Sequence, residues 1–216
     1  MEEVKDWFNE MKMTETVENL RKNDFEVITC SSSEEAKKEI LDLIPEGSLI
    51  GVGGSVTIRE LNILEVLEDR DVEVADHWKA HEEGKSAEEI RKIREKHLNS
   101  DVFLTSTNAL TKTGKLVNID GTGQRVAAMI YGPEKVILPV GINKICDDLH
   151  EGVDRARNIA APMNAKRLDL DTPCVETGEC EDCESEDRIC KVTTILDRRP
   201  HDTEITIVLI DETLGY

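Results

Sequence analysis

The chain has 216 residues, a formal net charge of −19 at pH 7 and an aromatic content of only 3%. A chain of this length can bury a substantial core, so we expect a single domain over residues 1–216. The charge argues against nucleic acid and anionic membranes as partners, because both need compensating lysine and arginine, whereas a small anionic ligand remains compatible with a local backbone site.

The first half of the chain alternates between predicted helices and strands. The apolar residues of 2–22 recur at spacings that predict one face of an amphipathic N-terminal helix; they are Val4, Trp7, Phe8, Met11, Val17 and Leu20. The segments that follow predict, in order, a strand over 25–30, a helix over 34–44, a strand over 48–53, a helix over 56–68 and a strand over 72–76.

The second half continues this alternation. Its segments predict, in order, a helix over 86–98, strands over 101–106 and 115–120, a helix over 123–131 and a strand over 135–140. A long helix over 148–168 is interrupted near Pro162, and two more strands cover 192–196 and 204–211. Repeated alternation with buried strands predicts an α/β domain with a largely parallel sheet flanked by helices.

Four cysteines lie close together in the segment 172–191 at the spacing C-x5-C-x2-C-x6-C; they are Cys174, Cys180, Cys183 and Cys190. Soft thiolate ligands suit tetrahedral zinc or an iron–sulfur cluster. Structural zinc ribbons usually have two C-x2-C pairs and this segment has one, so the spacing favours a [4Fe–4S] cluster, with zinc as the alternative. The acidic residues between the cysteines would disfavour the reduced form, which predicts a low-potential or structural centre.

Disulfides and free thiols are the two other interpretations of these cysteines. Disulfides need an oxidising compartment, whereas the opening residues lack the basic and apolar regions of a secretion signal. No stretch approaches the roughly 20 apolar residues of a membrane span. We therefore expect a cytoplasmic protein with no membrane insertion, in which the isolated Cys30 and Cys146 are buried or bystander thiols.

A glycine-rich loop over 51–57 leads into a predicted helix. Its candidate ligand-binding residues are Gly53, Gly54, Ser55 and Thr57. Glycines allow close backbone approach and hydroxyls lie near the helix N-terminus, which predicts a site for a phosphate, carboxylate or acyl group. The dinucleotide fingerprint is matched only in part, because Val56 occupies the third glycine position, and this argues against a nicotinamide cofactor such as NAD. A tight turn that needs small residues is the alternative.

Two further polar loops follow predicted strands. Their candidate ligand-binding residues are Thr107, Asn108, Thr111, Gly121, Arg125, Gly141, Asn143 and Lys144. Arg125 could hold a carboxylate or phosphate through two hydrogen bonds, and Asp120 could act as a catalytic acid or base, although Asp120 also fits an ordinary turn. Loops after parallel strands converge at one edge of the sheet, where such folds bind ligands.

Two other features give weaker signals. His77 and His81 stand four residues apart, so on a helix they would share a face and could bind a metal. No third ligand is marked nearby, and a surface pair or a pair at the rim of a pocket explains them better. Glu60 is a candidate active-site carboxylate, although a solvated helix charge explains it equally well.

Three segments together resemble the lactate-utilisation (LUD) domain family. They read GVGGSVTIREL, TSTNALTKTGKLVNIDGTGQRVAAMIYGPEKVILPVGINKI and RARNIAAPMNAKRL. The resemblance implies the fold of ribose-5-phosphate isomerase, glucosamine-6-phosphate deaminase and CoA transferases, in which glycine loops hold phosphate, sugar or acyl ligands. It also implies a link to L-lactate oxidation through iron–sulfur complexes. The chain lacks the ferredoxin motifs of the large cluster-bearing subunit, so it resembles the small, stand-alone form.

Three functional hypotheses follow. The first is an iron–sulfur LUD protein that binds a small anionic metabolite in lactate or related organic-acid redox metabolism and works with a redox partner protein. The second is a non-enzymatic accessory or ligand-binding protein with a structural metal site. The third is a cluster-independent isomerase or transferase acting on a sugar phosphate or an acyl substrate. Whether the chain is an enzyme stays open at this point, and a homodimer is the expected assembly.

Overall fold

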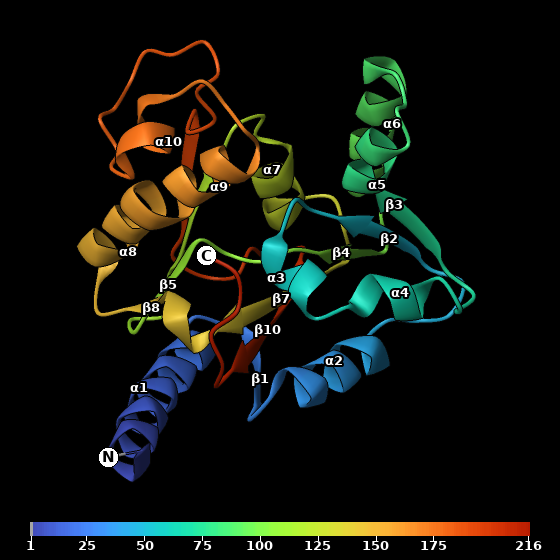
Figure 1. Cartoon of the computed structure of the whole chain (residues 1–216). Coiled ribbons are helices and arrows are strands. Elements are labelled where there is room, and N and C mark those ends of the chain that lie inside the picture. Colours follow the sequence, from blue (N-terminus) through green and yellow to red (C-terminus); the bar gives the residue numbers. More distant parts are fainter. Residues whose placement is uncertain (1) are drawn as a thin grey trace.

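Two β-sheets and the helices around them make up the structure, a computed structural model that describes residues 2–216 (Figure 1). Met1, the first residue of the predicted 1–216 domain, lies outside the described residues. The larger sheet has six strands in the order β1-β10-β7-β4-β2-β3, and every neighbouring pair is parallel. The predicted α/β class with a parallel sheet flanked by helices is therefore confirmed.

The strands of the large sheet coincide with apolar runs in the sequence. They are β1 (Glu26–Cys30), β2 (Leu49–Val52), β3 (Glu73–Asp76), β4 (Val102–Leu104), β7 (Lys135–Gly141) and β10 (Glu204–Ile210). Alternate residues face opposite sides, so Leu138 of β7 packs on one face and Ile137 on the other. Both faces of the central strands are covered, which explains why these strands are almost continuously apolar.

The second sheet is smaller and mixed, and the sequence did not predict it as a separate unit. Its order is β8-β5-β6-β9, and the strands are β5 (Ala109–Thr111), β6 (Leu116–Asp120), β8 (Ile145–Cys146) and β9 (Val192–Leu196). Strand β6 pairs antiparallel with β5 and β9, and β5 pairs parallel with β8. The strands predicted over 115–120 and 192–196 exist, but they belong to this second sheet.

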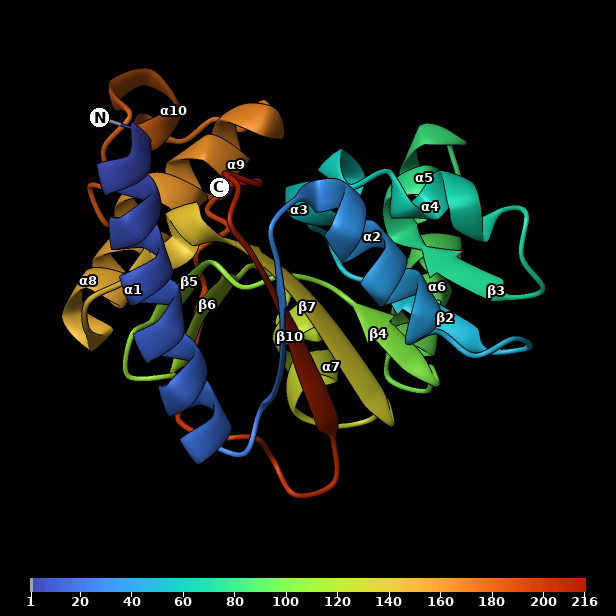
Figure 2. The same cartoon turned by 90° about the horizontal axis from the view of Figure 1, so that it is seen from below.

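The helices cover both faces of the large sheet. They are α1 (Glu2–Lys22), α2 (Ser33–Asp42), α3 (Val56–Glu60), α4 (Ile63–Leu67), α5 (His77–Glu82), α6 (Ala87–His97), α7 (Gln124–Ile130), α8 (Leu149–Arg155), α9 (Ala161–Arg167) and α10 (Pro173–Thr177). Helices α2, α3 and α4 pack on one face, whereas α7 and the small sheet pack on the other (Figure 2). Within residues 2–216, no helix is long and apolar enough to cross a membrane.

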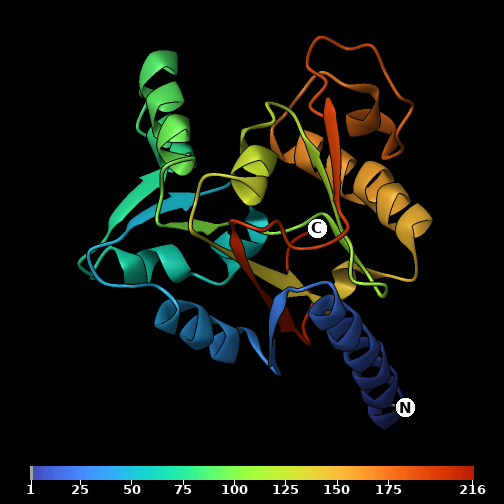
Figure 3. The same cartoon turned by 180° about the vertical axis from the view of Figure 1, so that it is seen from behind.

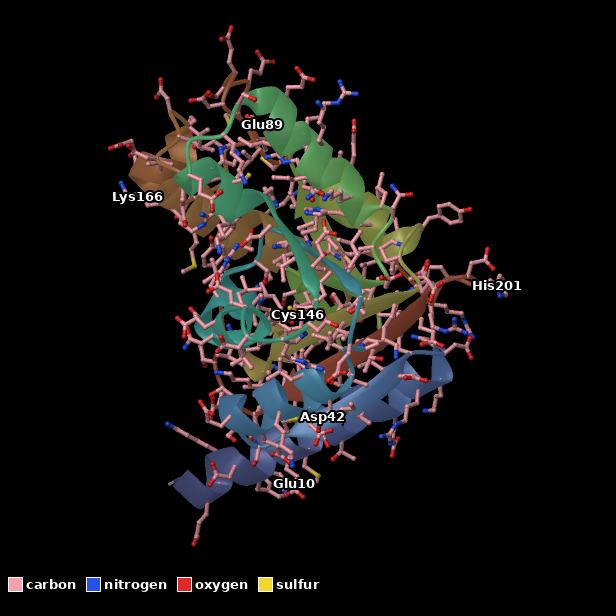
Figure 4. All side chains as sticks on the ribbon, turned by 90° about the vertical axis from the view of Figure 1, so that its right-hand side faces the viewer. Glu10, Asp42, Glu89, Cys146, Lys166 and His201 are labelled. Carbon is pink, nitrogen blue, oxygen red and sulfur yellow. The ribbon has the colours of Figure 1, made fainter. Side chains whose placement is uncertain are left out.

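Helix α1 has two apolar faces instead of the single face predicted. At about 100° of rotation per residue, Leu20 comes out roughly opposite to Val4. Val17 and Leu20 are buried in the core, but Trp7 and Phe8 are 58% and 57% exposed. The N-terminal half of α1 lies away from α6, so that Glu10 and Glu89 are at opposite ends of the molecule (Figure 4). Tertiary packing uses only the C-terminal half of the apolar pattern.

Two predicted helices are interrupted in ways their sequences explain. The segment 56–68 forms α3 and α4 instead of one helix, because Asn62 between them adopts a left-handed conformation with φ 49°. The segment 148–168 forms α8, a π-helical turn η2 (Ala156–Ala160) and α9. Pro162 follows this turn, and its missing N–H prevents a regular helix from continuing through it.

Candidate functional site

A cavity of about 540 Å³ opens where the carboxyl ends of the parallel strands meet. Its wall contains Ser55 after β2, His77 after β3, Ser106 after β4, Lys144 after β7 and Tyr216 after β10. Residues of α9 line it from one side, and residues of α3 and α5 line it from the other (Figure 1). Parallel strands deliver the loops that follow them to one edge, so this convergence has the cause that the sequence predicted.

Lys144 is a buried amine in the cavity wall, and its side chain comes from a 3-10 turn η1 (Ile142–Lys144) directly after β7. The residue is only 2% exposed. Its Nζ lies 2.8 Å from the Thr57 hydroxyl, 3.1 Å from the Ser106 hydroxyl and 3.3 Å from the Thr107 carbonyl oxygen. Burial and, to a smaller extent, the cations Arg155 and Arg125 lower the pKa of Lys144 from 10.5 to about 7, and the charge of Glu60 opposes them weakly.

Arg125, in the first turn of α7, holds the floor of the cavity together. Its Nε lies 3.3 Å from Asp120 Oδ2, and the rest of the guanidinium donates to the Ser106 carbonyl (3.0 Å), Asn118 Oδ1 (2.8 Å), Asn108 Oδ1 (3.2 Å) and the Ile119 carbonyl (2.8 Å). Asp120 Oδ1 accepts from the backbone of Thr122 and Gly123. All donors of Arg125 are thus engaged within the protein, so it supports the site instead of offering free hydrogen bonds to a ligand.

Two more cations, Arg94 and Arg167, lie in the part of the cavity wall formed by α6 and α9, which we call the outer wall. Arg94 of α6 has a buried Nε with no hydrogen-bond partner among the described residues. Arg167 of α9 lies with its guanidinium 4.1 Å from the Trp78 ring centroid, and its Nε donates to the Tyr216 hydroxyl at 2.9 Å. In the part of the chain that the structure describes, neither arginine nor Lys144 forms an ion pair with a carboxylate.

His77 of the cavity wall lies against a second buried histidine, His97. The rings of His77 and His97 have centroids 5.5 Å apart. His97 bonds to the Ala75 carbonyl and to Gln124, whereas His77 Nδ1 has no partner among the described residues. Burial, followed by the nearby His97 and Arg94, lowers the pKa of His77 from 6.5 to about 4. His77 is therefore neutral near pH 7.

The structure brings most of the predicted ligand-binding residues to the cavity. Its wall includes Gly54, Ser55, Thr57, Thr107, Asn108, Asp120, Gly121, Arg125 and Lys144. His77 and His81 also line it, as expected for a pair at the rim of a pocket. The side chain of Asp120 faces this space with both oxygens already accepting hydrogen bonds or pairing with Arg125.

The other predicted residues lie outside the cavity wall and support it; they are Gly53, Glu60, Thr111, Gly141 and Asn143. Glu60 Oε2 accepts from the Gly215 N–H at 2.6 Å, and Asn143 Oδ1 accepts from the Leu214 N–H at 3.1 Å. These two bonds hold the C-terminal segment in place, so that Tyr216 lies in the cavity wall. Thr111 closes the turn between β5 and β6 by accepting from the Lys115 N–H.

Sequence reasoning missed the cavity residues that come from helices. Among them are Trp78, Arg94, Asn164 and Arg167; the C-terminal Tyr216, which follows β10, was missed as well. Asn164 and Arg167 belong to the segment 155–168 that carries part of the family resemblance, which was the available signal. Arg94 lies in a helix with charges on most of its surface, and nothing local distinguishes it from the solvated charges around it.

The cysteine segment 172–191 adjoins the cavity through its C-terminal end. Ile189 lines the cavity, and the Lys191 N–H donates to the Asp120 carbonyl at 3.1 Å. All six cysteines are free thiols, and within residues 2–216 no three His, Cys, Asp or Glu side chains form a group that could hold a metal ion. The four thiols as arranged do not fit a cluster or a zinc ion, so the metal centre stays a prediction from spacing.

Fold and cavity together define an α/β protein with a polar, partly cationic cavity at the carboxyl edge of a parallel sheet. The chain matches the LUD domain family over residues 13–210 and belongs to that family, which confirms the predicted resemblance. No curated protein matches the chain.

Two solved structures are similar to the chain. A DUF162 family protein from Deinococcus radiodurans has a TM-score of 0.53 and 13% identity, and the match covers 94% of this chain and 98% of that one. This similarity shows a shared fold. A ribose 5-phosphate isomerase from Plasmodium falciparum matches with a TM-score of 0.31 and 21% identity over 52% of this chain and 51% of that one. The second similarity is too slight to establish a shared fold.

Replacing Arg125 should strongly destabilise the protein. Arg125→Met leaves the buried Asp120 carboxylate and several acceptors without partners, so we expect a loss of about 3–5 kcal/mol in the free energy of unfolding, measured with urea. The control is Arg91→Met, which removes an exposed pair with Glu95 and should change stability by no more than about 0.5 kcal/mol. Equal effects of the two substitutions would contradict this role of Arg125.

The histidine pair should make stability depend on pH. Because the pKa of His77 is about 4 in the folded protein and about 6.5 in the unfolded chain, only the unfolded chain binds the proton between these values. The contribution of the neutral, buried His77 to the free energy of unfolding is fully present above pH 6.5, and it declines by about 3 kcal/mol as the pH falls towards 4. His77→Gln should flatten this decline in urea unfolding, whereas His150→Gln, at an exposed position, should leave it unchanged. An unchanged slope in His77→Gln would refute the assignment.

Proposed function

We propose that this LUD family protein binds a small anionic metabolite, a carboxylate or phosphate compound of organic-acid metabolism, in the cavity at the carboxyl edge of the large sheet. The observation that carries the proposal is the buried amine of Lys144 in the cavity wall, which has no carboxylate partner in the described chain. A buried cation without a counter-ion is unfavourable, and an anionic ligand would supply the missing charge.

The charge distribution supports this proposal. The chain as a whole carries a net charge of −19, yet the cavity wall contains Lys144, Arg94, Arg125 and Arg167 against the acidic residues Asp120 and Glu82. Asp120 is already paired with Arg125, so the cations without a partner carboxylate determine the local field. Interactions inside a partly buried cavity are screened less than those on the surface, and they can outweigh the repulsion from distant acidic groups.

Family membership supports a role of the lactate-utilisation type. Lactate and its relatives are small carboxylates, and their charge suits the cations of this cavity. Asp120, the predicted acid or base, has its oxygens engaged by the Thr122 and Gly123 backbone and by Arg125. In this proposal it therefore positions Arg125 and the loop around it, and the ligand is held by Lys144 and the arginines of the outer wall.

Binding of simple anions tests the proposal. Titration calorimetry of the full chain with L-lactate, pyruvate and inorganic phosphate should detect at least one ligand. Lys144→Met and Arg94→Gln should each weaken its binding at least about tenfold, because a charge-assisted hydrogen bond contributes about 1.5–3 kcal/mol. Lys92→Gln is the matched control, since Lys92 lies on α6 and pairs with Glu88 at the surface. No binding by the wild type, or equal binding by all variants, would sink the proposal.

Chemical analysis tests the predicted [4Fe–4S] centre separately. If the cysteine segment rearranges around a cluster, anaerobically purified protein should contain about four irons and four acid-labile sulfides per chain, and the double change Cys180→Ser and Cys183→Ser should remove them. Stoichiometric zinc would support the structural alternative. Protein that holds neither metal would refute the prediction from the spacing and leave the cavity proposal intact.

A further inference from the structure

The amine of Lys144 can be satisfied in its neutral form. The Ser106 hydroxyl donates its proton to the Pro139 carbonyl at 2.7 Å, so its oxygen accepts from Lys144 Nζ. The Thr107 carbonyl accepts the second N–H. The Thr57 hydroxyl lies 2.8 Å from Nζ and 3.5 Å from the Leu214 carbonyl, so its proton can point to the nitrogen lone pair or away from it. Rotation of one hydroxyl thus covers or frees the lone pair.

The surroundings also disfavour the ammonium form. Arg155 and Arg125 are both partly or fully buried cations whose charges lower the pKa of Lys144, and no carboxylate in the described chain forms an ion pair with it. Burial acts in the same direction and is the larger cause, which brings that pKa to about 7. Desolvation next to other cations is a known way to make a lysine nucleophilic near neutral pH.

We propose that Lys144 is a nucleophile that condenses with the carbonyl carbon of a 2-oxo acid bound in the cavity. The reacting amine faces the cavity beside two hydroxyls, Thr57 and Ser106, and the outer wall supplies Arg94 and Arg167 for the carboxylate of the ligand. This inference rests on the proposed function, because it names the substrate class of the same site: a carbonyl compound that also carries an acid group.

The condensation balances without a cofactor. The nitrogen lone pair forms the N–C bond while the carbonyl π electrons move to oxygen, and a proton passes from nitrogen to that oxygen to give a carbinolamine. The hydroxyl then leaves as water together with the remaining N–H proton, which gives the C=N bond of an imine, and hydrolysis of the imine reverses these steps. The Thr57 hydroxyl, at 2.8 Å from Nζ, is placed to relay the proton. The imine, once protonated, draws electrons from the neighbouring carbon and so activates it for proton loss.

Reductive trapping with sodium borohydride tests the proposal. Full-length protein is incubated with pyruvate, reduced, digested and mapped by mass spectrometry. We expect the reduced adduct on the peptide that contains Lys144, at least tenfold above the level at the exposed Lys92, and a trapping rate that rises as pH increases through about 7. L-Lactate has no carbonyl group, so it should compete with pyruvate without being trapped.

Two outcomes separate this proposal from the anion-binding proposal. If calorimetry shows that pyruvate binds but the wild type forms no adduct at Lys144, the nucleophile is refuted and anion binding stands. If pyruvate and the other anions fail to bind, both proposals fall. Mapping of the wild type decides the matter without any variant, because the exposed Lys92 in the same digest is the internal control.

Discussion

The buried guanidinium of Arg125 is the interaction on which the site depends, because it joins the two sheets at the floor of the cavity. It donates to the carbonyl of Ser106, which follows β4 of the large sheet, and to Asn118 and Ile119 in β6 of the small sheet. Asp120 balances its charge and organises the turn before α7. One side chain therefore links the loop that carries Thr107 to β6, the strand that pairs with β9 directly after the cysteine segment. Figure 3 shows the small sheet from behind, with the cysteine segment above it.

The residues that Arg125 holds in place explain the low pKa of Lys144. The segments after β2, β4 and β7 bring the hydroxyls of Thr57 and Ser106 within hydrogen-bond distance of Lys144 Nζ. Arg155 and Arg125 add positive charge nearby, which the charge of Glu60 opposes only weakly. Polar but uncharged partners satisfy the amine in either protonation state. The same arrangement serves anion binding, which uses its charge, and carbonyl chemistry, which uses its lone pair.

The sequence predicted the large sheet well, because its strands are apolar runs bounded by glycine, proline and capping residues. It missed the small sheet, since β5 and β8 have only three and two residues and β8 is a strand only through its pairing with the distant β5. The cavity loops were predictable because parallel strands direct them to one edge. Arg94 and Arg167 were not predictable, because in sequence they resemble ordinary surface arginines. Only the tertiary packing of α6 and α9 places them in the cavity wall.

The central claim is that a small anion occupies the cavity beside Lys144. A crystal structure of the wild-type protein grown with saturating pyruvate tests it most directly. The account predicts density for one molecule in this cavity, with its carboxylate near Arg94 or Arg167 and its carbonyl carbon bonded to or facing Lys144 Nζ. A cavity that holds only water at saturating pyruvate, or pyruvate bound at another place on the chain, would contradict the account.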